Sequence, residues 1–253
     1  MVELRGVSLS YLFKRKGKAS ALRDVDAVFE TGNISAIIGP SGCGKTSLLK
    51  IIAALITPNE GTVFVAGTSL NGIRHKTAVI FQDYGLLPWK TVRANAELPL
   101  RIQGGFSHES RKKVDSLFDE FGLADFTGLY PHQLSGGMKQ RLAIIRALAS
   151  GPELLLMDEP FSSLDALGRE EAQDFLLSVQ REHKLTVIMV THSIEEAVYL
   201  ADSVFIMTGL NPGSITKHIN ISREMSHADF RREGRFQEYC TTLRQAFKST
   251  TPP

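Results

Sequence analysis

Hydrophobic and polar positions alternate along the first thirty residues, and this period of two predicts paired β-strands in VELRGVSLSYL and LRDVDAVFE. The charged stretch between them, KRKGK, predicts a turn. The pattern then becomes an unbroken apolar run, ISAII from Ile34, which is typical of a buried strand. A glycine-rich loop follows, and SLLKIIAALI predicts a helix that is ended by Thr57 and Pro58. Further strands are predicted in GTVFVAG and TAVIFQ.

From about Leu86 to Gly151 the hydrophobic period is that of helices. The helix predicted in VDSLFDEFG is stopped by Gly122 and places four apolar residues on one face: Val114, Leu117, Phe118 and Phe121. RLAIIRALA predicts a second helix, which Gly151 and Pro152 close. This stretch is therefore interpreted as a helical segment inserted into the fold.

After Gly151, strands alternate with helices: LLLM, a helix over Arg169 to Glu182, TVIMV, IEEAVYLAD and SVFIM. This alternation predicts a parallel sheet of the doubly wound kind. ISAII also runs straight into GPSGCGKT, which fits the phosphate-binding pattern G-x-x-x-x-G-K-[ST]. The expected fold class is therefore α/β: a P-loop (RecA-like) nucleotide-binding core with an N-terminal antiparallel β subdomain and an inserted α-helical subdomain. We expect one domain over 1–253, with the core and β subdomain in 1–85 and 152–215, the helical subdomain in 86–151 and a helical tail in 216–253.

The predicted tail places apolar residues at helical spacing: Phe236, Tyr239 or Cys240, Leu243 and Phe247. This spacing predicts an amphipathic helix packed on its own domain. A regulatory or membrane-surface role is the alternative, and the mixing of basic with acidic residues disfavours it.

The glycine-rich loop GPSGCGKT fits G-x-x-x-x-G-K-[ST] between a predicted strand and a predicted helix. In such a loop, backbone N–H groups surround the β-phosphate, Lys45 reaches the β- and γ-phosphate oxygens, and the Thr46 hydroxyl binds Mg²⁺. Cys43 is interpreted as a small residue tolerated in the loop rather than as a redox switch. The predicted nucleotide site comprises Gly39, Pro40, Ser41, Gly42, Cys43, Gly44, Lys45, Thr46 and Ser47.

Polar residues follow three other predicted strands: Asp158 and Glu159 follow LLLM, Gln82 follows AVIF, and His192 follows TVIMV and Thr191. Ligands of a doubly wound sheet bind beyond the carboxyl ends of its strands, so these side chains are expected in one crevice. We expect Asp158 to hold Mg²⁺, Gln82 to contact Mg²⁺ or the attacking water, and Glu159 to polarise that water. His192 is expected to hydrogen-bond the γ-phosphate. The predicted catalytic residues are Glu159, His192, Lys45 and Gln82, and the predicted metal ligands are Thr46, Gln82 and Asp158.

A second glycine-rich motif, LSGGMKQ, precedes a predicted helix. The free N–H groups of Gly136 and Gly137, with Ser135, at the positive end of a helix dipole are typical of an anion site. SSLD, which ends at Asp165, follows the acidic pair and could line the same cleft as that pair.

Composition excludes some functions. Lys and Arg number 29 against 27 Asp and Glu, a net charge of +2, so the basic surplus of a phosphate-binding nucleic-acid partner is absent. Two cysteines make no disulfide framework and favour a reducing compartment. The apolar runs are far shorter than the ~20 residues that span a bilayer, so we expect any membrane role to come through a partner.

Together the motifs resemble the nucleotide-binding subunit of an ATP-binding cassette (ABC) transporter, over nearly the whole chain up to about Ile215. GPSGCGKT resembles the Walker A motif, LLLMDE the Walker B motif, LSGGMKQ the signature and SSLD the D-loop; Gln82 matches the Q-loop and His192 the switch histidine. The resemblance implies ATP and Mg²⁺ as ligands, and Tyr11, or alternatively Phe13, as the aromatic that stacks on adenine.

The resemblance also implies a head-to-tail pair of cassettes, as a homodimer or with a second related ATPase. Ser135, Gly136 and Gly137 of one copy would then close on the γ-phosphate held by the other copy. The same resemblance places a membrane-subunit docking site at some of Tyr84, Leu86, Leu87 and Trp89, with core packing as the alternative.

A narrower resemblance is to the importer branch that handles nitrate, aliphatic sulfonates, taurine and related small anions, or pyrimidine precursors of thiamine. Three stretches carry it: FQDYGLLPWKTVRAN, LMDEPFSSLDALGR and ADSVFIMTGLNPGSI. The chain departs from the usual pattern of this branch at three places. It has FSSLDA in place of an FGALDA-type stretch and Ser193 in place of the aspartate after the switch histidine. GLNPGSI matches the usual RPG-containing strand end imperfectly. The implied partners are transmembrane permease subunits and, through them, a solute-binding protein, with no nucleic acid. The implied location is peripheral, on the cytoplasmic face of a bacterial cell membrane. A soluble single-cassette ATPase in cofactor assembly is the alternative function.

Overall fold

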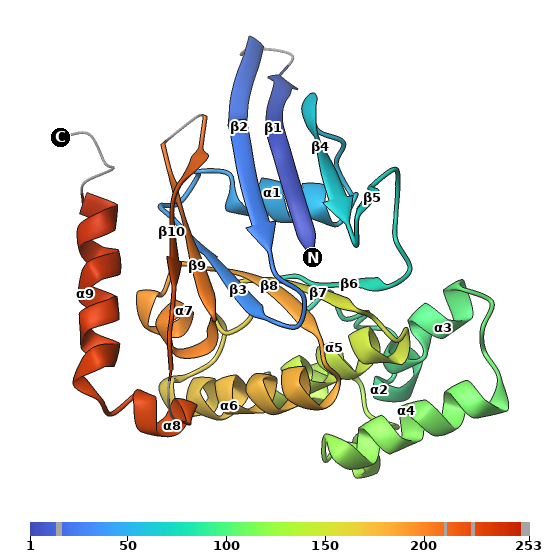
Figure 1. Cartoon of the computed structure of the whole chain (residues 1–253). Coiled ribbons are helices and arrows are strands. Elements are labelled where there is room, and N and C mark those ends of the chain that lie inside the picture. The colour runs from blue at the N-terminus through green and yellow to red at the C-terminus, as the bar shows by residue number, and fades with distance from the viewer. Residues whose placement is uncertain (14–16, 210–211, 224–225, 249–253) are drawn as a thin grey trace.

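The computed structural model describes residues 1–13, 17–209, 212–223 and 226–248, and Figure 1 shows two sheets with the helices arranged around them. The smaller sheet is antiparallel, in the order β2-β1-β4-β5. Its strands are β1 (Val2–Phe13), β2 (Gly17–Phe29), β4 (Glu60–Val65) and β5 (Thr68–Ser69). The predicted pairing of the first two strands is confirmed, with Val2 opposite Phe29. Lys14 to Lys16 of the predicted turn lie outside the described residues, and β2 already begins at Gly17.

The larger sheet has the order β10-β9-β3-β8-β7-β6. Its strands are β3 (Ile34–Ile38), β6 (Thr77–Ile80), β7 (Leu154–Asp158), β8 (Thr186–Thr191), β9 (Ser203–Thr208) and β10 (Ser214–Asn220). All pairs from β9 to β6 are parallel, and every residue of β3, β7 and β8 is buried. Strands covered on both faces need continuous apolar sequence, which explains ISAII, LLLM and TVIMV. The predicted parallel sheet is confirmed.

The edge strand β10 corrects one boundary, because residues 216–220, assigned to the helical tail, belong to this strand. β10 runs antiparallel to β9, and the His218 ring stacks on Phe205 at 4.4 Å between centroids. Pairing with β9 therefore outweighs the helical expectation for these residues. The helical part of the tail starts later, at α8 (His227–Phe230) and α9 (Gly234–Lys248).

The first helix, α1 (Lys45–Ile52), is shorter at its carboxyl end than the predicted one. Ala54 takes a left-handed conformation with φ of 56°, and the N–H groups of Leu55 and Ile56 both donate to the Lys50 carbonyl. These bonds satisfy the last carbonyls of α1 and end it before Leu55.

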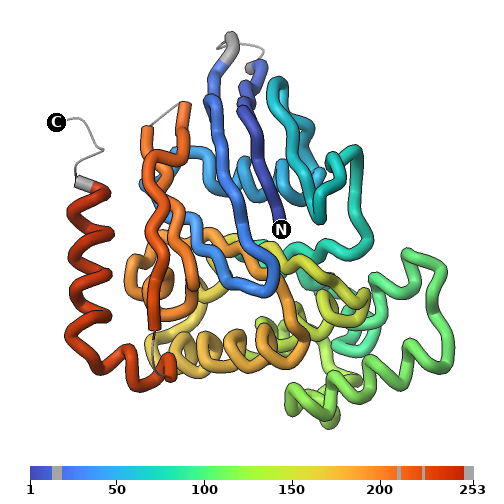
Figure 2. Tube along the Cα trace, viewed as in Figure 1, coloured from blue at the N-terminus to red at the C-terminus, as the bar shows by residue number. Residues whose placement is uncertain are grey.

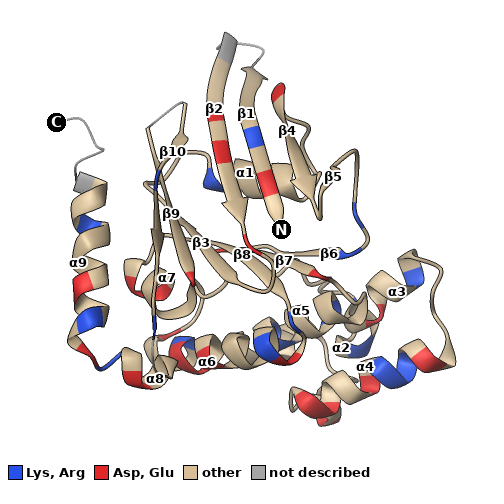
Figure 3. Ribbon diagram, in the orientation of Figure 1, with Lys and Arg blue, Asp and Glu red and all other residues tan. Residues whose placement is uncertain are grey.

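The predicted helical insertion contains α2 (Val92–Ala96), α3 (Leu98–Ile102), α4 (His108–Glu120) and α5 (Gly136–Ala149), with short 3-10 turns at Ala124–Phe126 and Pro131–Gln133. The apolar face predicted for α4 is buried, and Gly122, with φ of 64°, follows its end. Two further helices, α6 (Ala166–Glu182) and α7 (Ile194–Leu200), pack on the same side of the large sheet as α5. Figure 3 shows charges of both signs interspersed along α4, α6 and α9.

Two apolar clusters lie on opposite faces of the large sheet. One contains α5, α6, α7 and the helical insertion, and the other fills the space between this sheet, α1 and the antiparallel sheet. The helix α9 runs beside β10, at the opposite side of the molecule from α3 and α4 (Figure 2). Its buried residues are Phe236, Cys240, Leu243 and Ala246, so the predicted packing of an amphipathic tail helix is confirmed. None of the described helices is both long and apolar enough to cross a bilayer.

Candidate functional site

The loop between β3 and α1 depends on glycine at two positions. A Cβ atom on Gly39 would lie 2.6 Å from the Met207 carbonyl oxygen, and one on Gly44 would lie 2.6 Å from a methyl carbon of Leu22. Gly44 also has a φ of 97°, which side chains other than glycine rarely tolerate. The backbone can therefore curl closely enough to direct its N–H groups at a bound anion.

Lys45 begins α1 and lies within the curl of this loop. Its ammonium group is buried and donates to the carbonyls of Gly39, at 2.8 Å, and Pro40, at 2.9 Å. Cys43 is fully buried beneath the loop, and burial raises the pKa of its thiol, so the neutral form dominates. This environment agrees with Cys43 as a small packed residue.

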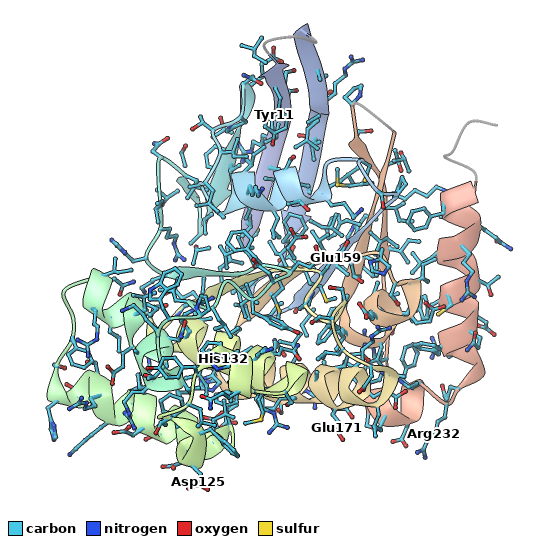
Figure 4. The ribbon with its side chains drawn as sticks, turned by 180° about the vertical axis from the view of Figure 1, so that it is seen from behind. Tyr11, Asp125, His132, Glu159, Glu171 and Arg232 are labelled. Atoms are coloured by element: carbon cyan, nitrogen blue, oxygen red, sulfur yellow. The ribbon has the colours of Figure 1, made fainter. Side chains whose placement is uncertain are left out.

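A cavity of about 460 Å³ opens in front of the loop. Tyr11, on the antiparallel sheet, and Glu159, after β7, lie on two sides of it, and both are labelled in Figure 4. The Tyr11 hydroxyl lies 3.0 Å from the Ser47 Oγ. The side chain of Phe13, the alternative to Tyr11, is outside the described part of the structure. The full lining is Tyr11, Ala19, Ala21, Ser41, Gly42, Gly44, Lys45, Thr46, Ser47 and Glu159.

Asp158 is the last residue of β7 and faces the start of α1. The Thr46 hydroxyl donates to the Asp158 Oδ1 at 3.2 Å. Burial raises the pKa of the Asp158 carboxyl, and the hydrogen bond from Thr46 opposes this rise. A hydroxyl and a carboxylate oxygen at this separation are the hard oxygen ligands that Mg²⁺ prefers, so these two residues fit the predicted metal role.

Glu159 and His192 come together across two adjacent strands. β7 and β8 are parallel neighbours, and His192 follows β8 directly. The His192 Nδ1 lies 3.3 Å from the Glu159 Oε2. Glu159 has a left-handed φ of 48°, and its N–H donates to the Val190 carbonyl at 2.9 Å. The main chain thus turns sharply at Glu159 and holds its carboxylate at the cavity wall.

Gln82 is not among the described residues that line the cavity at Lys45, and its predicted role stays a prediction. β6 is the edge strand beside β7, with Ile80 opposite Met157, and it ends at Ile80. Gln82 lies in the turn that follows, where the Tyr84 N–H donates to the Phe81 carbonyl at 2.8 Å, and its side chain is exposed.

The second glycine-rich motif begins α5. Ser135 is the N-cap of this helix, and its Oγ accepts from the Met138 N–H at 3.3 Å. A Cβ on Gly136 would lie 2.9 Å from Leu164, whereas one on Gly137 would meet nothing within 4 Å. A separate cavity of about 270 Å³ opens here, lined by Ser135, Gly136, Gly137, Gln140, Arg141, Ser163, Leu164, Asp165, Gly168, Glu171, Ala172 and Phe175.

Asp165 belongs to this second cavity and not to the cavity in front of Lys45, where SSLD was expected. The chain turns at Phe161–Leu164, and Asp165 becomes the N-cap of α6, where its carboxylate accepts from the Gly168 N–H at 2.8 Å. Among the described residues, the two cavities share no lining residue.

Several residues that support the site were not predicted. Ala21 and Ala19 leave room opposite Tyr11, and alanine at alternate positions of β2 was the available signal. Gly213, in GLNPGSI, accepts from the Arg23 N–H and donates to the Ala21 carbonyl, both at 3.0 Å. A Cβ on Gly213 would lie 1.8 Å from the Cys43 carbonyl oxygen, so this segment packs directly against the glycine-rich loop. No local sequence signal could reveal that contact.

A buried carboxylate supports the His192 segment from behind. Glu196 is 7% exposed, accepts from the Thr191 hydroxyl at 2.6 Å, and lies 3.7 Å from the Arg169 Nε. The Thr191 hydroxyl in turn accepts from the Ser193 N–H at 3.1 Å. Burial raises the pKa of the Glu196 carboxyl.

The four residues considered for docking divide into two groups. Tyr84 is buried, at 5% exposed, which agrees with core packing. Trp89 is 72% exposed, and Leu86 and Leu87 are half-buried. The exposed end of this loop is therefore its carboxyl half.

The fold and the site together define a P-loop NTPase. A family model described as "ABC transporter" matches residues 22–162. The nitrate import ATP-binding protein NrtD of Synechocystis is 40% identical, over 82% of this chain and 78% of that protein. The aliphatic sulfonates import ATP-binding protein SsuB of Bacillus licheniformis is 45% identical, over 81% of this chain and 78% of that protein.

Among solved structures, the dimeric post-hydrolysis state of the ATP-binding cassette MJ0796, bound to ADP and Pi, matches with a TM-score of 0.76 and 32% identity. The match covers 88% of this chain and all of that one. The chain belongs to the ABC transporter family, and its enzymatic class is that of the ABC-type ATPases.

Proposed function

We propose that this chain is the ATP-binding and ATP-hydrolysing subunit of a membrane importer for a small solute, an anion such as nitrate or a sulfonate. The observation that carries the hydrolytic part is the contact of Glu159 with His192 at the wall of the cavity that Lys45 and Thr46 also line. This arrangement combines a phosphate-binding loop with a base at hydrogen-bonding distance from a second polar group.

The chemistry assigned to these residues is displacement at the γ-phosphate. Lys45 and the loop N–H groups hold the β- and γ-phosphate oxygens. The bond from the γ-phosphorus to the oxygen bridging to the β-phosphate breaks, water forms the new bond, and Glu159 takes up the proton of that water. His192 orients the Glu159 carboxylate through its Nδ1–H and, as the imidazolium, also donates from Nε2 to the γ-phosphate. Thr46 and Asp158 would hold Mg²⁺, which neutralises phosphate charge when bound.

The signature motif supports a dimeric form. The N-terminus of α5 offers free N–H groups and the positive end of a helix dipole, yet it opens into a cavity separate from the one at Lys45. A head-to-tail second copy would place Ser135, Gly136 and Gly137 against the γ-phosphate. Gln82 would join the site through a movement of the loop that carries it, since its side chain is exposed in this structure.

The proposed partners follow from the loop after Gln82. Leu86, Leu87 and Trp89 offer an apolar surface of the kind that protein interfaces bury, and we assign it to a transmembrane permease subunit. A solute-binding protein would act through that permease. The chain would then lie on the cytoplasmic face of the cell membrane.

Anionic solutes are supported by the names of the relatives that import nitrate and aliphatic sulfonates.

Two measurements test this proposal. The purified chain should hydrolyse ATP only with Mg²⁺ present, and magnesium-independent or undetectable turnover would contradict the assigned chemistry.

A tagged chain, expressed in its own cells, should co-purify from membranes with a multi-span protein, and Trp89→Ala should weaken that recovery. Recovery of soluble partners alone would favour the cofactor-assembly alternative, which no observation now supports.

A further inference from the structure

The turn after Gln82 is held by two other parts of the chain. Tyr84 and Gly85 are consecutive left-handed residues, with φ of 61° and 56°. The Arg146 guanidinium, on α5, donates to the carbonyls of both, at 2.5 Å each. A left-handed tyrosine is strained and persists only where its surroundings determine the conformation. The signature helix α5 is one of these surroundings.

The second attachment is the Tyr84 hydroxyl. It lies 2.9 Å from the Ser163 Oγ and 3.4 Å from the Pro160 carbonyl oxygen. Burial raises the pKa of the Tyr84 phenol, so it stays protonated and able to donate. Pro160 follows Glu159 directly. Ser163 lines the second cavity, the one in front of Ser135, Gly136 and Gly137, which we call the signature cavity. One buried hydroxyl thus joins the turn after Gln82 to the D-loop.

The loop Leu86–Trp89, which follows Gly85, is held by hydrogen bonds to Asn95. Asn95, fully buried on α2, accepts from the Leu87 N–H at 2.8 Å and donates to the carbonyls of Leu87, at 3.1 Å, and Lys90, at 3.0 Å. Trp89, which is 72% exposed, is carried on this braced loop. A displacement of Trp89 would therefore move the whole loop and act on Tyr84.

We propose that Tyr84 and Ser163 are positioning residues whose hydrogen bond couples the loop Leu86–Trp89 to the D-loop and the signature cavity. This inference rests on the proposed function, because the loop is the assigned permease surface and the cavity is the assigned contact with the partner's nucleotide. Closure of the dimer on ATP restricts the motion of the D-loop. Through its bond to the Tyr84 hydroxyl, the D-loop then also restricts the motion of the loop Leu86–Trp89. Ser163 is a position where this chain departs from the alanine of an FGALDA-type stretch, so the coupling is a property of this chain's own sequence.

The test uses hydrogen exchange in Glu159→Gln, which should retain ATP. Exchange is compared with and without ATP and Mg²⁺ for peptides covering residues 39–46 and 84–90. We expect ATP to slow exchange in both peptides. Ser163→Ala and Tyr84→Phe should each weaken the ATP-dependent protection of 84–90 by roughly fivefold, the factor that corresponds to the ~1 kcal/mol net contribution of one hydrogen bond. Protection of 39–46 should stay unchanged.

Three further variants separate coupling from general stability. The Tyr84→Phe/Ser163→Ala double variant should lose no more than Tyr84→Phe alone, because the Tyr84 hydroxyl takes part in both the bond to Ser163 and the longer one to Pro160. Ser163→Thr keeps the hydroxyl and should retain the protection. Tyr239→Phe removes a hydroxyl that accepts from the Ser222 N–H at 3.1 Å in the tail, and it should behave as the parent.

The outcomes distinguish this inference from the function on which it rests. Absence of ATP-dependent protection in 39–46 would contradict the proposed nucleotide site itself. Protection of 39–46 together with unchanged protection of 84–90 in Ser163→Ala would overturn the coupling alone. Additive losses in the double variant would also overturn it, because the two side chains would then act independently.

Discussion

Two helices of this molecule begin at glycine-rich motifs, and they differ in what surrounds them. α1 starts at Lys45, behind Gly44, and faces a cavity that also contains Thr46 and Glu159. α5 starts behind Ser135 and faces a smaller cavity whose lining includes Arg141, Asp165 and Glu171. Both ends can bind an anion through N–H groups and the helix dipole. Beside the first, Glu159 contacts His192 at 3.3 Å and the Thr46 hydroxyl donates to Asp158 at 3.2 Å.

The comparison teaches that similar local chemistry serves different tasks. In the proposed function, the α1 motif would be the binding and catalytic half of a site, and the α5 motif would supply binding groups to it. Because the two cavities share no lining residue among those described, one copy of the chain does not bring the halves together. A second copy would do so, and substitutions in each motif should therefore fail in different ways.

The largest expected effect is on the catalytic half. Glu159→Gln should lower kcat by about 10²–10⁴-fold, the range typical of a lost general base, and leave ATP binding intact. Size-exclusion chromatography should then show an ATP-dependent dimer, since the ligand that joins the halves persists. Turnover within tenfold of the parent would contradict the role of Glu159.

Substitutions in the α5 motif should instead prevent two copies of the chain from associating. In Gly137→Asp the added Cβ enters open space, with none of the neighbouring segments within 4 Å, and its carboxylate would face the partner's phosphate. The variant should bind ATP normally, form no ATP-dependent dimer and lose at least about 10²-fold in turnover, by charge repulsion in a desolvated site. Gly128→Asp, also in open space, is the matched control. Loss of ATP affinity in Gly137→Asp would mean that the motif acts within its own chain.

A smaller effect is expected for His192, which acts through Glu159 and the γ-phosphate. His192→Ala should lower kcat by about 10–100-fold, less than Glu159→Gln, because the base remains in place. Steady-state kinetics with both variants gives the order. If His192→Ala lowered kcat more than Glu159→Gln does, His192 and not Glu159 would be the principal catalytic group.

The smallest effect concerns the buried carboxylate that supports His192. The folded-state pKa of Glu196 is raised by burial, with Arg169, His192 and Glu159 as the charged neighbours. Its contribution to stability is therefore present below the unfolded pKa and is lost as pH rises through the folded pKa. Glu196→Gln should flatten this decline in urea unfolding as the pH rises above the ordinary glutamate pKa of about 4, whereas Glu195→Gln, on the exposed neighbour, should not. A steeper decline in Glu196→Gln would reverse the sign of this argument.

Much of this architecture follows from sequence because its signals are local. The spacing of Gly39, Gly44 and Lys45 predicts the loop, and the buried runs predict the parallel sheet. Strand order is not local, and this is why the sequence predicts the parallel strands but not the position of β6 at the edge, beside β7. The contact of Gly213 with Cys43 and the bond of Tyr84 to Ser163 join distant segments. Only the folded chain reveals such pairs.

The central claim is that one site is built from α1 of one copy and α5 of another. Lys45→Ala and Gly137→Asp should each abolish turnover alone, because every site in either homodimer carries one defect. Mixed in equal amounts with ATP and Mg²⁺, they should recover about a quarter of the parent activity, since half of the dimers are mixed and each holds one intact site of two. No recovery, with mixed dimers demonstrated by differential tagging, would contradict the claim.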